Sequence, residues 1–110
     1  GQAIADFQNT QFKLADMATS LETARLILRQ AAVKVDDGAP DKTKFAAMAK
    51  RYVTDAGFEV ANEALQIHGG YGYLKDYEVE RMVRDLRVHQ ILEGTNEIMR
   101  VIIARELMRA

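Results

Sequence analysis

Glu93 is the residue of this chain best placed to act in acid–base chemistry. It lies in residues 91–97 (ILEGTNE), where a carboxylate follows two apolar residues and directly precedes a glycine. Desolvation disfavours a charged carboxylate and raises its pKa toward neutral pH, which a general base requires. The alternative is an ordinary helix boundary, with Glu93 solvated and Gly94 only a turn residue. The residue types alone favour that alternative.

A second unusual stretch, residues 66–73 (QIHGGYGY), contains three glycines and two tyrosines. Glycines at 69, 70 and 72 would let another backbone or a flat polar ligand come close, and Gln66 can donate and accept hydrogen bonds. The alternative is a helix C-cap followed by a tight turn with aromatic packing. Composition alone favours the C-cap.

Several other chemistries find no support in the sequence. There are no cysteines for disulfides, zinc–thiolate sites or thiol nucleophiles. Neither histidine, His68 or His89, has an acidic residue three positions before it, so the Glu-x-x-His pairs of a di-iron bundle are missing and we expect no metal. The net charge of −1 gives no basic surface for nucleic acid, and no apolar run approaches the ~20 residues that span a bilayer. We therefore expect neither nucleic acid nor membrane as a partner.

The elements that must hold the two loops are predicted to be helices. At 48% hydrophobic and 28% charged residues, the composition is that of one globular domain. In the first third, apolar residues recur at steps of three and four, as on a helix with one buried stripe. These residues are Leu14, Met17, Leu21, Ala24, Leu28, Ala31 and Val35. The helix should stop at residues 36–40, where Gly38 can take a left-handed cap and Pro40 cannot continue it.

A second long helix is predicted to run antiparallel to the first, with Asp41 as its cap and Gly69 at its end. Its apolar positions are Phe45, Met48, Tyr52, Val53, Ala56, Val60, Ala64 and Ile67. Each long helix should have about 25–30 residues and a length of roughly 40 Å. A shorter helix carries Val79, Met82, Val83 and Leu86, and a final helix carries Ile98, Ile102 and Leu107, with Thr95 or Asn96 as its N-cap. No segment alternates like a strand, so we predict an all-α, up-and-down four-helix bundle.

The two loops, taken together, resemble the acyl-CoA dehydrogenase family. The resemblance is carried by Gln66-x-x-Gly69-Gly70-x-Gly72-Tyr73, then Arg84-Asp85, then Glu93-Gly94-Thr95-Asn96-Glu97-Ile98-x-Arg100, with Phe7-Gln8 and Leu14-Ala15-Asp16-Met17 upstream. It covers essentially the whole chain, and the stretch from Arg87 to Glu93, which includes residues 89–92 (HQIL), is similar to the isobutyryl-CoA, or short branched-chain, branch. The resemblance implies that residues 1–110 are the C-terminal helical domain of a longer protein, without its N-terminal helical and middle β-domains. The absence of an initiator methionine fits a chain cut from something longer.

The resemblance also implies a reaction. The Glu93 carboxylate would take the α-proton of an acyl-CoA thioester while the β-hydrogen leaves as hydride for FAD, giving a trans-2-enoyl-CoA. Such an α-proton is weakly acidic, so donors must stabilise the charge that develops on the carbonyl oxygen. In this family the donors are the backbone N–H of the catalytic glutamate and a ribityl hydroxyl of the flavin. Gly94 corresponds to a substrate-contacting position.

Residues that fall where the family contacts FAD are Phe7, Gln8, Gln66, Ile67, His68, Gly69, Gly70, Thr95, Asn96 and Glu97. Much of that contact crosses between subunits in the family. The helix start near Thr95 should offer free N–H groups to a polar or anionic part of the cofactor. We interpret Arg84-Asp85 as a buried or partly buried ion pair that fixes the loop.

The implied partners are acyl-CoA, a second copy of the chain in a homodimer or homotetramer, and electron-transfer flavoprotein. The implied compartment is the cytoplasm in a bacterium or the mitochondrial matrix in a eukaryote. The chain by itself should show no turnover and at best weak flavin binding, because few walls would exclude water from the flavin. Two alternatives stay open: a helical oligomerisation module in which Glu93 does no chemistry, and a noncatalytic bundle that binds a CoA-type or flavin ligand.

Overall fold

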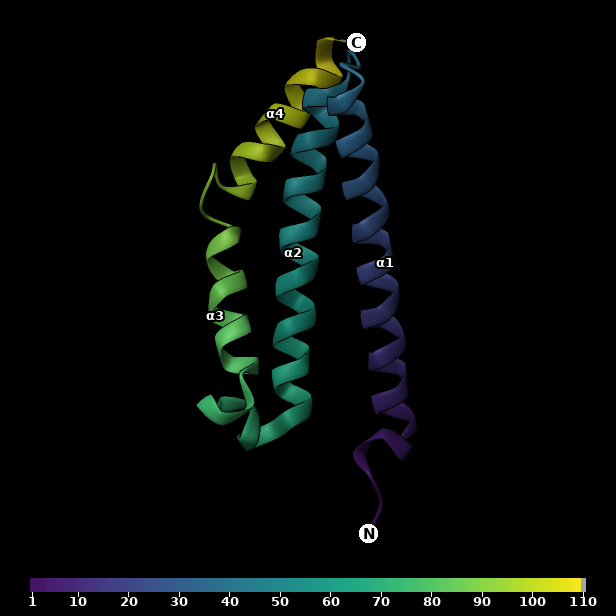
Figure 1. Ribbon diagram of the computed structural model, residues 1–110, viewed down its shortest axis with the longest axis vertical. Helices are drawn as coiled ribbons and strands as arrows, with labels where there is room; N and C mark the ends of the chain where they lie inside the picture. Colours follow the sequence, from purple (N-terminus) through teal and green to yellow (C-terminus); the bar gives the residue numbers. More distant parts are fainter. Residues whose placement is uncertain (110) are drawn as a thin grey trace.

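The protein is a set of four α-helices joined by short turns, as seen in a computed structural model that describes residues 1–109 (Figure 1). The α-helices are α1 (Gln8–Asp36), α2 (Lys42–His68), α3 (Val79–His89) and α4 (Asn96–Arg109). The remaining helical elements are three short 3-10 helices, η1 (Ile4–Asp6), η2 (Gly69–Tyr73) and η3 (Lys75–Tyr77). The prediction of an all-α fold with four helices is confirmed, and the two long helices have 29 and 27 residues.

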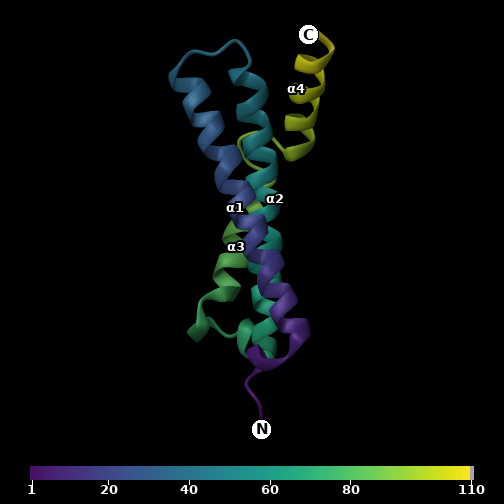
Figure 2. The ribbon, with the colours of Figure 1, turned by 90° about the vertical axis from the view of Figure 1, so that its right-hand side faces the viewer.

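Helix α2 lies at the centre of the arrangement. It contacts α1 along one side, and α3 and α4 follow one another along its other side (Figures 1 and 2). Within residues 1–109, α1 contacts neither α3 nor α4. The domain is therefore elongated, with extents of 58 × 25 × 23 Å. The other three α-helices thus depend on α2 for their placement.

The turn between α1 and α2 follows the predicted chemistry at its first half. Gly38 has φ +63°, and the N–H groups of Gly38 and Ala39 donate to the carbonyls of Val35 and Lys34 at 3.1 and 2.9 Å. These two bonds are a Schellman motif that satisfies the last carbonyls of α1. Asp41 does precede α2, but it makes no side-chain cap bond. The expected capping role is wrong, because its carboxylate instead accepts two bonds from the Lys34 ammonium at 2.9 and 3.0 Å.

The buried core is built mainly from alanines. The buried apolar residues are Ala24 and Ala31 of α1, Ala47, Ala49, Ala56 and Ala61 of α2, Val79 of α3 and Met99 of α4. Small side chains at a contact allow helix axes to approach closely. Every predicted apolar position of α2 is buried or half-buried, because α2 has neighbours on two sides.

The predicted stripe of α1 is only partly buried. Leu14, Leu28 and Val35 are exposed, whereas Ala24 and Ala31 are buried. The prediction of a buried stripe is wrong for these three positions, because α2 is the only α-helix that α1 contacts within residues 1–109 and one neighbour covers only a narrow strip. Many other large apolar side chains of the domain are also exposed.

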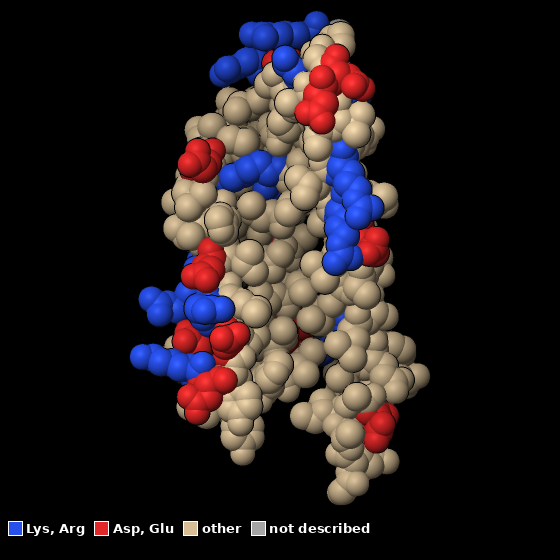
Figure 3. Space-filling model, in the orientation of Figure 1, with Lys and Arg blue, Asp and Glu red and all other residues tan. Residues whose placement is uncertain are grey.

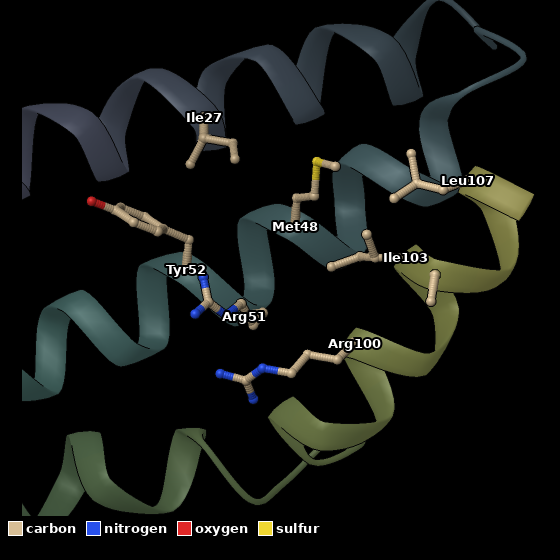
Figure 4. Close-up of a pocket in the computed structure, with 8 residues that line it drawn as sticks. Ile27, Met48, Arg51, Tyr52, Arg100, Ile103 and Leu107 are labelled. Carbon is tan, nitrogen blue, oxygen red and sulfur yellow. The ribbon is translucent and has the colours of Figure 1, made fainter.

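An open apolar groove of about 370 Å³ lies between α1, α2 and α4 (Figure 4). Its lining residues are Ile27, Met48, Arg51, Tyr52, Arg100, Ile103, Ala104 and Leu107. The groove exists because α1 and α4 flank α2 without meeting. In the view of Figure 3, charged side chains gather along α3 and near the top of the molecule, and much of the surface between and below them is uncharged.

Candidate active site

The loop between α3 and α4 has an unusual backbone at Glu93. Glu93 has φ +57° and Gly94 has φ +85°, so both occupy the left-handed region. A non-glycine residue is uncommon in that region, and observed strain of this kind is associated with functional sites. A Cβ on Gly94 would lie 2.8 Å from the Cε methyl of Met99. Glycine at 94 is therefore favoured mainly by its conformation, because the Met99 methyl lies at the end of a flexible side chain and can move aside.

The loop is closed by hydrogen bonds at both of its ends. The N–H groups of Ile91 and Leu92 donate to the Val88 carbonyl at 2.9 Å, which extends the end of α3. At the other end, the N–H of Asn96 donates to the Gln90 carbonyl at 3.0 Å. Residues 90–96 thus form a compact turn that fixes where Glu93 stands.

Thr95 is the N-cap of α4. Its hydroxyl accepts a hydrogen bond from the Ile98 N–H at 3.2 Å, the usual contact of an N-cap threonine. Of the two predicted caps, the structure thus selects Thr95. Because Ile98 and Asn96 already have acceptors for their N–H groups, the helix start offers fewer free donors than we expected.

Asn96 is the one buried polar residue among those described, with 3% of its surface exposed. Its side-chain amide donates to the Asp55 carboxylate at 2.7 Å and to the Thr54 hydroxyl at 2.9 Å. Its side-chain oxygen accepts a bond of 2.7 Å from the Lys50 ammonium, which also donates to the Gly94 carbonyl at 2.7 Å. The start of α4 is thereby fastened to the middle of α2.

The Asp55 carboxylate contacts the remaining polar groups around this junction. One of its oxygens accepts from the amides of Gln90 and Asn96, at 2.9 and 2.7 Å. The other lies 3.6 Å from both the Arg51 and the Arg100 guanidinium groups, which come from α2 and α4 and lie near one another in Figure 4. Groups from α2, α4 and the loop therefore meet at one carboxylate.

Glu93 itself is exposed, as are its neighbours Ile91 and Leu92. Residues 1–109 thus show the solvated Glu93 that the residue types alone favour, and they do not by themselves supply the desolvation that a general base requires. The apolar neighbours are present, but they project from the surface beside the carboxylate and do not cover it. Water exclusion at Glu93 requires a further covering surface.

The turn after α2 brings the second sequence motif onto the same side of α2 as α3. Gly69 ends α2 with φ +63°, and the Tyr71 and Tyr77 rings lie 5.5 Å apart, so the predicted C-cap with an aromatic turn is confirmed. A Cβ on Gly72 would lie 2.6 Å from the Leu65 carbonyl oxygen, so the turn closes tightly against α2. A Cβ on Gly69 or Gly70 would meet no atom within 4 Å. At Gly70, whose φ is not in the left-handed region, packing within residues 1–109 does not explain the glycine.

These motifs fit one family. The family model described as acyl-CoA dehydrogenase, C-terminal domain, matches residues 1–108. The chain belongs to the acyl-CoA dehydrogenase family.

Individual relatives agree with the family model. The chain is 51% identical over 109 residues to the mitochondrial isobutyryl-CoA dehydrogenase of Bos taurus, a match that covers 99% of this chain and 26% of the relative. The structure of butyryl-CoA dehydrogenase from Megasphaera elsdenii superposes with a TM-score of 0.94 at 43% identity, covering 99% of this chain and 28% of that one. A FAD complex of PigA superposes with a TM-score of 0.91 at 32% identity, covering 100% and 29%. The chain thus spans about a quarter of the length of these relatives.

The residues predicted to bind the cofactor of an acyl-CoA dehydrogenase lie in two separate places. Phe7, Gln8 and residues 66–70 lie at the end of the domain where α1 begins and α2 ends (Figure 1). Thr95, Asn96 and Glu97 lie beyond α3, whose 11 residues extend about 16 Å. One chain therefore does not bring the two groups together.

The side chains within these groups differ in what they offer. Phe7, Gln8, Gln66 and Glu97 are exposed, while His68 is exposed with its Nδ1 2.7 Å from the Ala64 carbonyl. The Asn96 side chain is committed to α2, so only its backbone remains for a ligand. The assignment of these residues to FAD stays a prediction.

The interpretation of Arg84 and Asp85 as a buried ion pair is wrong. Both are exposed, and neither is part of an ion pair within residues 1–109. Consecutive helical residues point in different directions, which keeps the two side chains apart. Arg84 instead lines a hollow of about 470 Å³ with Leu65 and Tyr73, beside the glycine turn.

Sequence reasoning missed the polar residues of α2 that hold the loop of this acyl-CoA dehydrogenase domain. Lys50, Thr54 and Asp55 interrupt an otherwise apolar helix face with helical spacing. Polar residues at such positions on a central helix are a usable signal, because buried polar groups require partners. Within the described residues, no cluster of His, Cys, Asp and Glu could hold a metal ion, and no helix has the length and hydropathy to cross a bilayer.

Proposed function

We propose that this chain is the C-terminal domain of a flavoenzyme that converts an acyl-CoA thioester to a trans-2-enoyl-CoA. In this proposal Glu93 is the base that removes the α-proton. The observation that carries it is the left-handed backbone of Glu93, φ +57°, held between hydrogen bonds to α3 and α2. A strained carboxylate residue in a fixed turn is the arrangement that a positioned base requires.

The backbone of Glu93 supports a second role. Ile91 and Leu92 donate their N–H groups to Val88, whereas the Glu93 N–H has no acceptor within residues 1–109. A free and fixed amide beside the base can donate to a thioester carbonyl oxygen as negative charge develops there. Glu93 would then supply both the base and one hydrogen-bond donor, and Gly94 would leave room for the acyl chain to pass.

The glycine turn after α2 fits a flat cofactor. The Cβ directions of Gly69 and Gly70 are open, so a ring system can approach the backbone closely there. The exposed amide of Gln66 lies one turn earlier and can both donate and accept hydrogen bonds. FAD, when bound, supplies the acceptor for the β-hydrogen, which leaves the substrate as hydride. The residues of this chain would hold FAD in place and exclude water from one side of it.

A second copy of the chain is part of the proposal. Residues 66–70 and residues 95–97 lie on opposite ends of α3, so one chain does not place both groups around the same part of a cofactor, and we propose that they come from two chains. The exposed apolar side chains of α1 and α4 provide surface for that association. We propose a homodimer or homotetramer in which this association covers Ile91, Leu92 and Glu93.

The substrate and the electron acceptor are the finer parts of the proposal. Leu92 beside Glu93 is consistent with a short branched acyl group, and similarity to the Bos taurus enzyme supports this choice. Reduced FAD would pass its electrons to electron-transfer flavoprotein. A panel of straight and branched acyl-CoA substrates on the full-length parent, with electron-transfer flavoprotein as acceptor, tests both points.

The decisive test is Glu93→Gln in the full-length parent flavoprotein. We expect FAD to remain bound and acyl-CoA-dependent bleaching of the flavin absorbance to be lost. Glu78→Gln is the matched control, because Glu78 is an exposed glutamate with nearly the same backbone conformation, φ +61°. Flavin bleaching at an unchanged rate in Glu93→Gln would refute the proposal.

The same experiment separates the alternative functions. An oligomerisation module or a noncatalytic flavin-binding bundle predicts that Glu93→Gln changes neither flavin reduction nor FAD content. Loss of reduction with intact FAD content is expected only if Glu93 takes part in the reaction.

A further inference from the structure

Lys50 is a half-buried lysine that makes no ion pair within residues 1–109. Its ammonium group instead donates to two uncharged oxygens, the Gly94 carbonyl and the Asn96 side chain, each at 2.7 Å. Distances this short are typical of charge-assisted hydrogen bonds. Both acceptors belong to the loop of Glu93. The Lys50 ammonium therefore does not neutralise a carboxylate but holds the loop in place.

The two bonds act on the strained part of that loop. The Gly94 carbonyl follows directly after the two residues with positive φ, Glu93 and Gly94. A left-handed residue returns to a more common conformation unless its surroundings hold it. The loop leaves α3 at one end and is fixed to α2 at the other through Lys50, so release of the Gly94 carbonyl removes the restraint nearest to Glu93.

Asn96 makes the attachment specific. Because its side chain also donates to Thr54 and Asp55, the oxygen that faces Lys50 is fixed in orientation. The Lys50 ammonium therefore joins the fixed side-chain oxygen of Asn96 to the carbonyl of Gly94, whose backbone is strained. Both contacts join residues more than forty positions apart in the sequence.

We infer that Lys50 is a positioning residue for Glu93: through the Gly94 carbonyl it holds the base in its left-handed conformation and aims its carboxylate and N–H at the substrate. This inference rests on the function proposed for Glu93. Lys50 touches the loop backbone and does not take part in proton transfer itself.

The test uses Lys50→Met in the full-length parent flavoprotein, with Lys42→Met as the control, because Lys42 is an exposed lysine in the first turn of α2. A displacement of about 1 Å at a reacting group can cost on the order of a hundredfold in rate. We expect the rate constant of flavin reduction to fall by about ten- to a hundredfold in Lys50→Met, with FAD content and KM for acyl-CoA changed by less than about threefold. Lys50→Arg, which keeps a cationic donor, should recover part of the rate.

Hydrogen exchange supplies a readout that does not depend on the reaction. The backbone N–H of Asn96 donates to the Gln90 carbonyl and should exchange faster in Lys50→Met than in Lys42→Met. Exchange of the backbone N–H groups in the middle of α1 should be the same in both variants. If Lys50→Met does not yield a folded flavoprotein, Lys50→Gln is measured in its place, because glutamine keeps a donor for one of the two oxygens.

The outcomes distinguish this inference from the proposed function. If Glu93→Gln abolishes reduction but Lys50→Met reduces flavin within twofold of the parent rate, the role of Lys50 is refuted and that of Glu93 stands. If Glu93→Gln leaves reduction intact, the proposed function fails first. A fall in FAD content that accounts for the whole rate loss in Lys50→Met would also overturn the inference, since Lys50 would then support only folding.

Discussion

Replacing Glu93 by glycine should make this domain more stable. A left-handed conformation costs an L-residue about 1–2 kcal/mol, and glycine does not have this penalty. In a helix interior the order is reversed, because glycine is about 1 kcal/mol less favourable than alanine. At position 93, where φ is +57°, we therefore expect the free energy of unfolding of the Glu93→Gly chain to be about 1 kcal/mol higher than that of the Glu93→Ala chain.

The assay is thermal or urea unfolding of the purified chain. For a domain of roughly this size, 1 kcal/mol corresponds to a difference in Tm of about 4 °C. The same pair of substitutions at Glu59, an exposed position inside α2, should give the opposite order, while the pair at Glu78 should repeat the order at Glu93. A Glu93→Gly chain that is less stable than Glu93→Ala would refute the reasoning, because the backbone would not be left-handed there. Under the function proposed for Glu93, the stabilised variant of the full-length parent should show no flavin reduction, as expected where function maintains strain.

The remaining predictions concern the turns and the buried polar junction. Gly72→Ala should lower the unfolding free energy by about 2 kcal/mol through a clash with the last turn of α2, whereas Gly70→Ala should change it by less than about 0.5 kcal/mol; urea unfolding of both compares them. Asn96→Leu should destabilise by about 2–3 kcal/mol in the same assay, because it removes the hydrogen bonds of the buried Asn96 side chain with Lys50, Thr54 and Asp55. The hydrogen bond from Lys34 lowers the pKa of Asp41 below its ordinary value of 3.8, so the resulting stabilisation is complete above that pH and disappears as the pH falls through the lowered pKa. The Tm difference between wild type and Lys34→Met should therefore shrink on acidification, and a difference that grows would contradict the assignment.

The sequence predicted the helices well because their limits are set locally. Gly38 and Gly69 end α1 and α2 where expected, since a backbone with positive φ depends only on adjacent residues. The apolar spacing of α2 also translated into burial, because its neighbours lie on two sides. For α1 the same spacing overestimated burial at Leu14 and Leu28, since spacing identifies an apolar stripe but not the number of helices that will cover it.

The candidate site was predicted in part. The motif around Glu93 predicts a base, a role that stays a prediction, and the positive φ of Gly94 gives a physical reason for the glycine that follows it. The contacts of Lys50 and Asp55 with Asn96 join residues more than forty positions apart, so local pattern reasoning did not find them. The exposure of Glu93 could not be read from its apolar neighbours, because residue type does not say whether a side chain is covered from outside.

The 27-residue α2 sets the distance and the angle between the two motifs of this domain. Lys50 lies in its first half and Gly69 follows its last residue, without a proline or a glycine-capped break between them. Each residue of an α-helix advances the chain by about 1.5 Å and rotates it by about 100°. A single insertion or deletion between Lys50 and Gln66 would therefore turn one motif away from the other, while an insertion of seven residues would nearly restore the angle but add roughly 10 Å. Length variation among functional relatives should accordingly fall in the turns around α2 and be absent from this part of the helix.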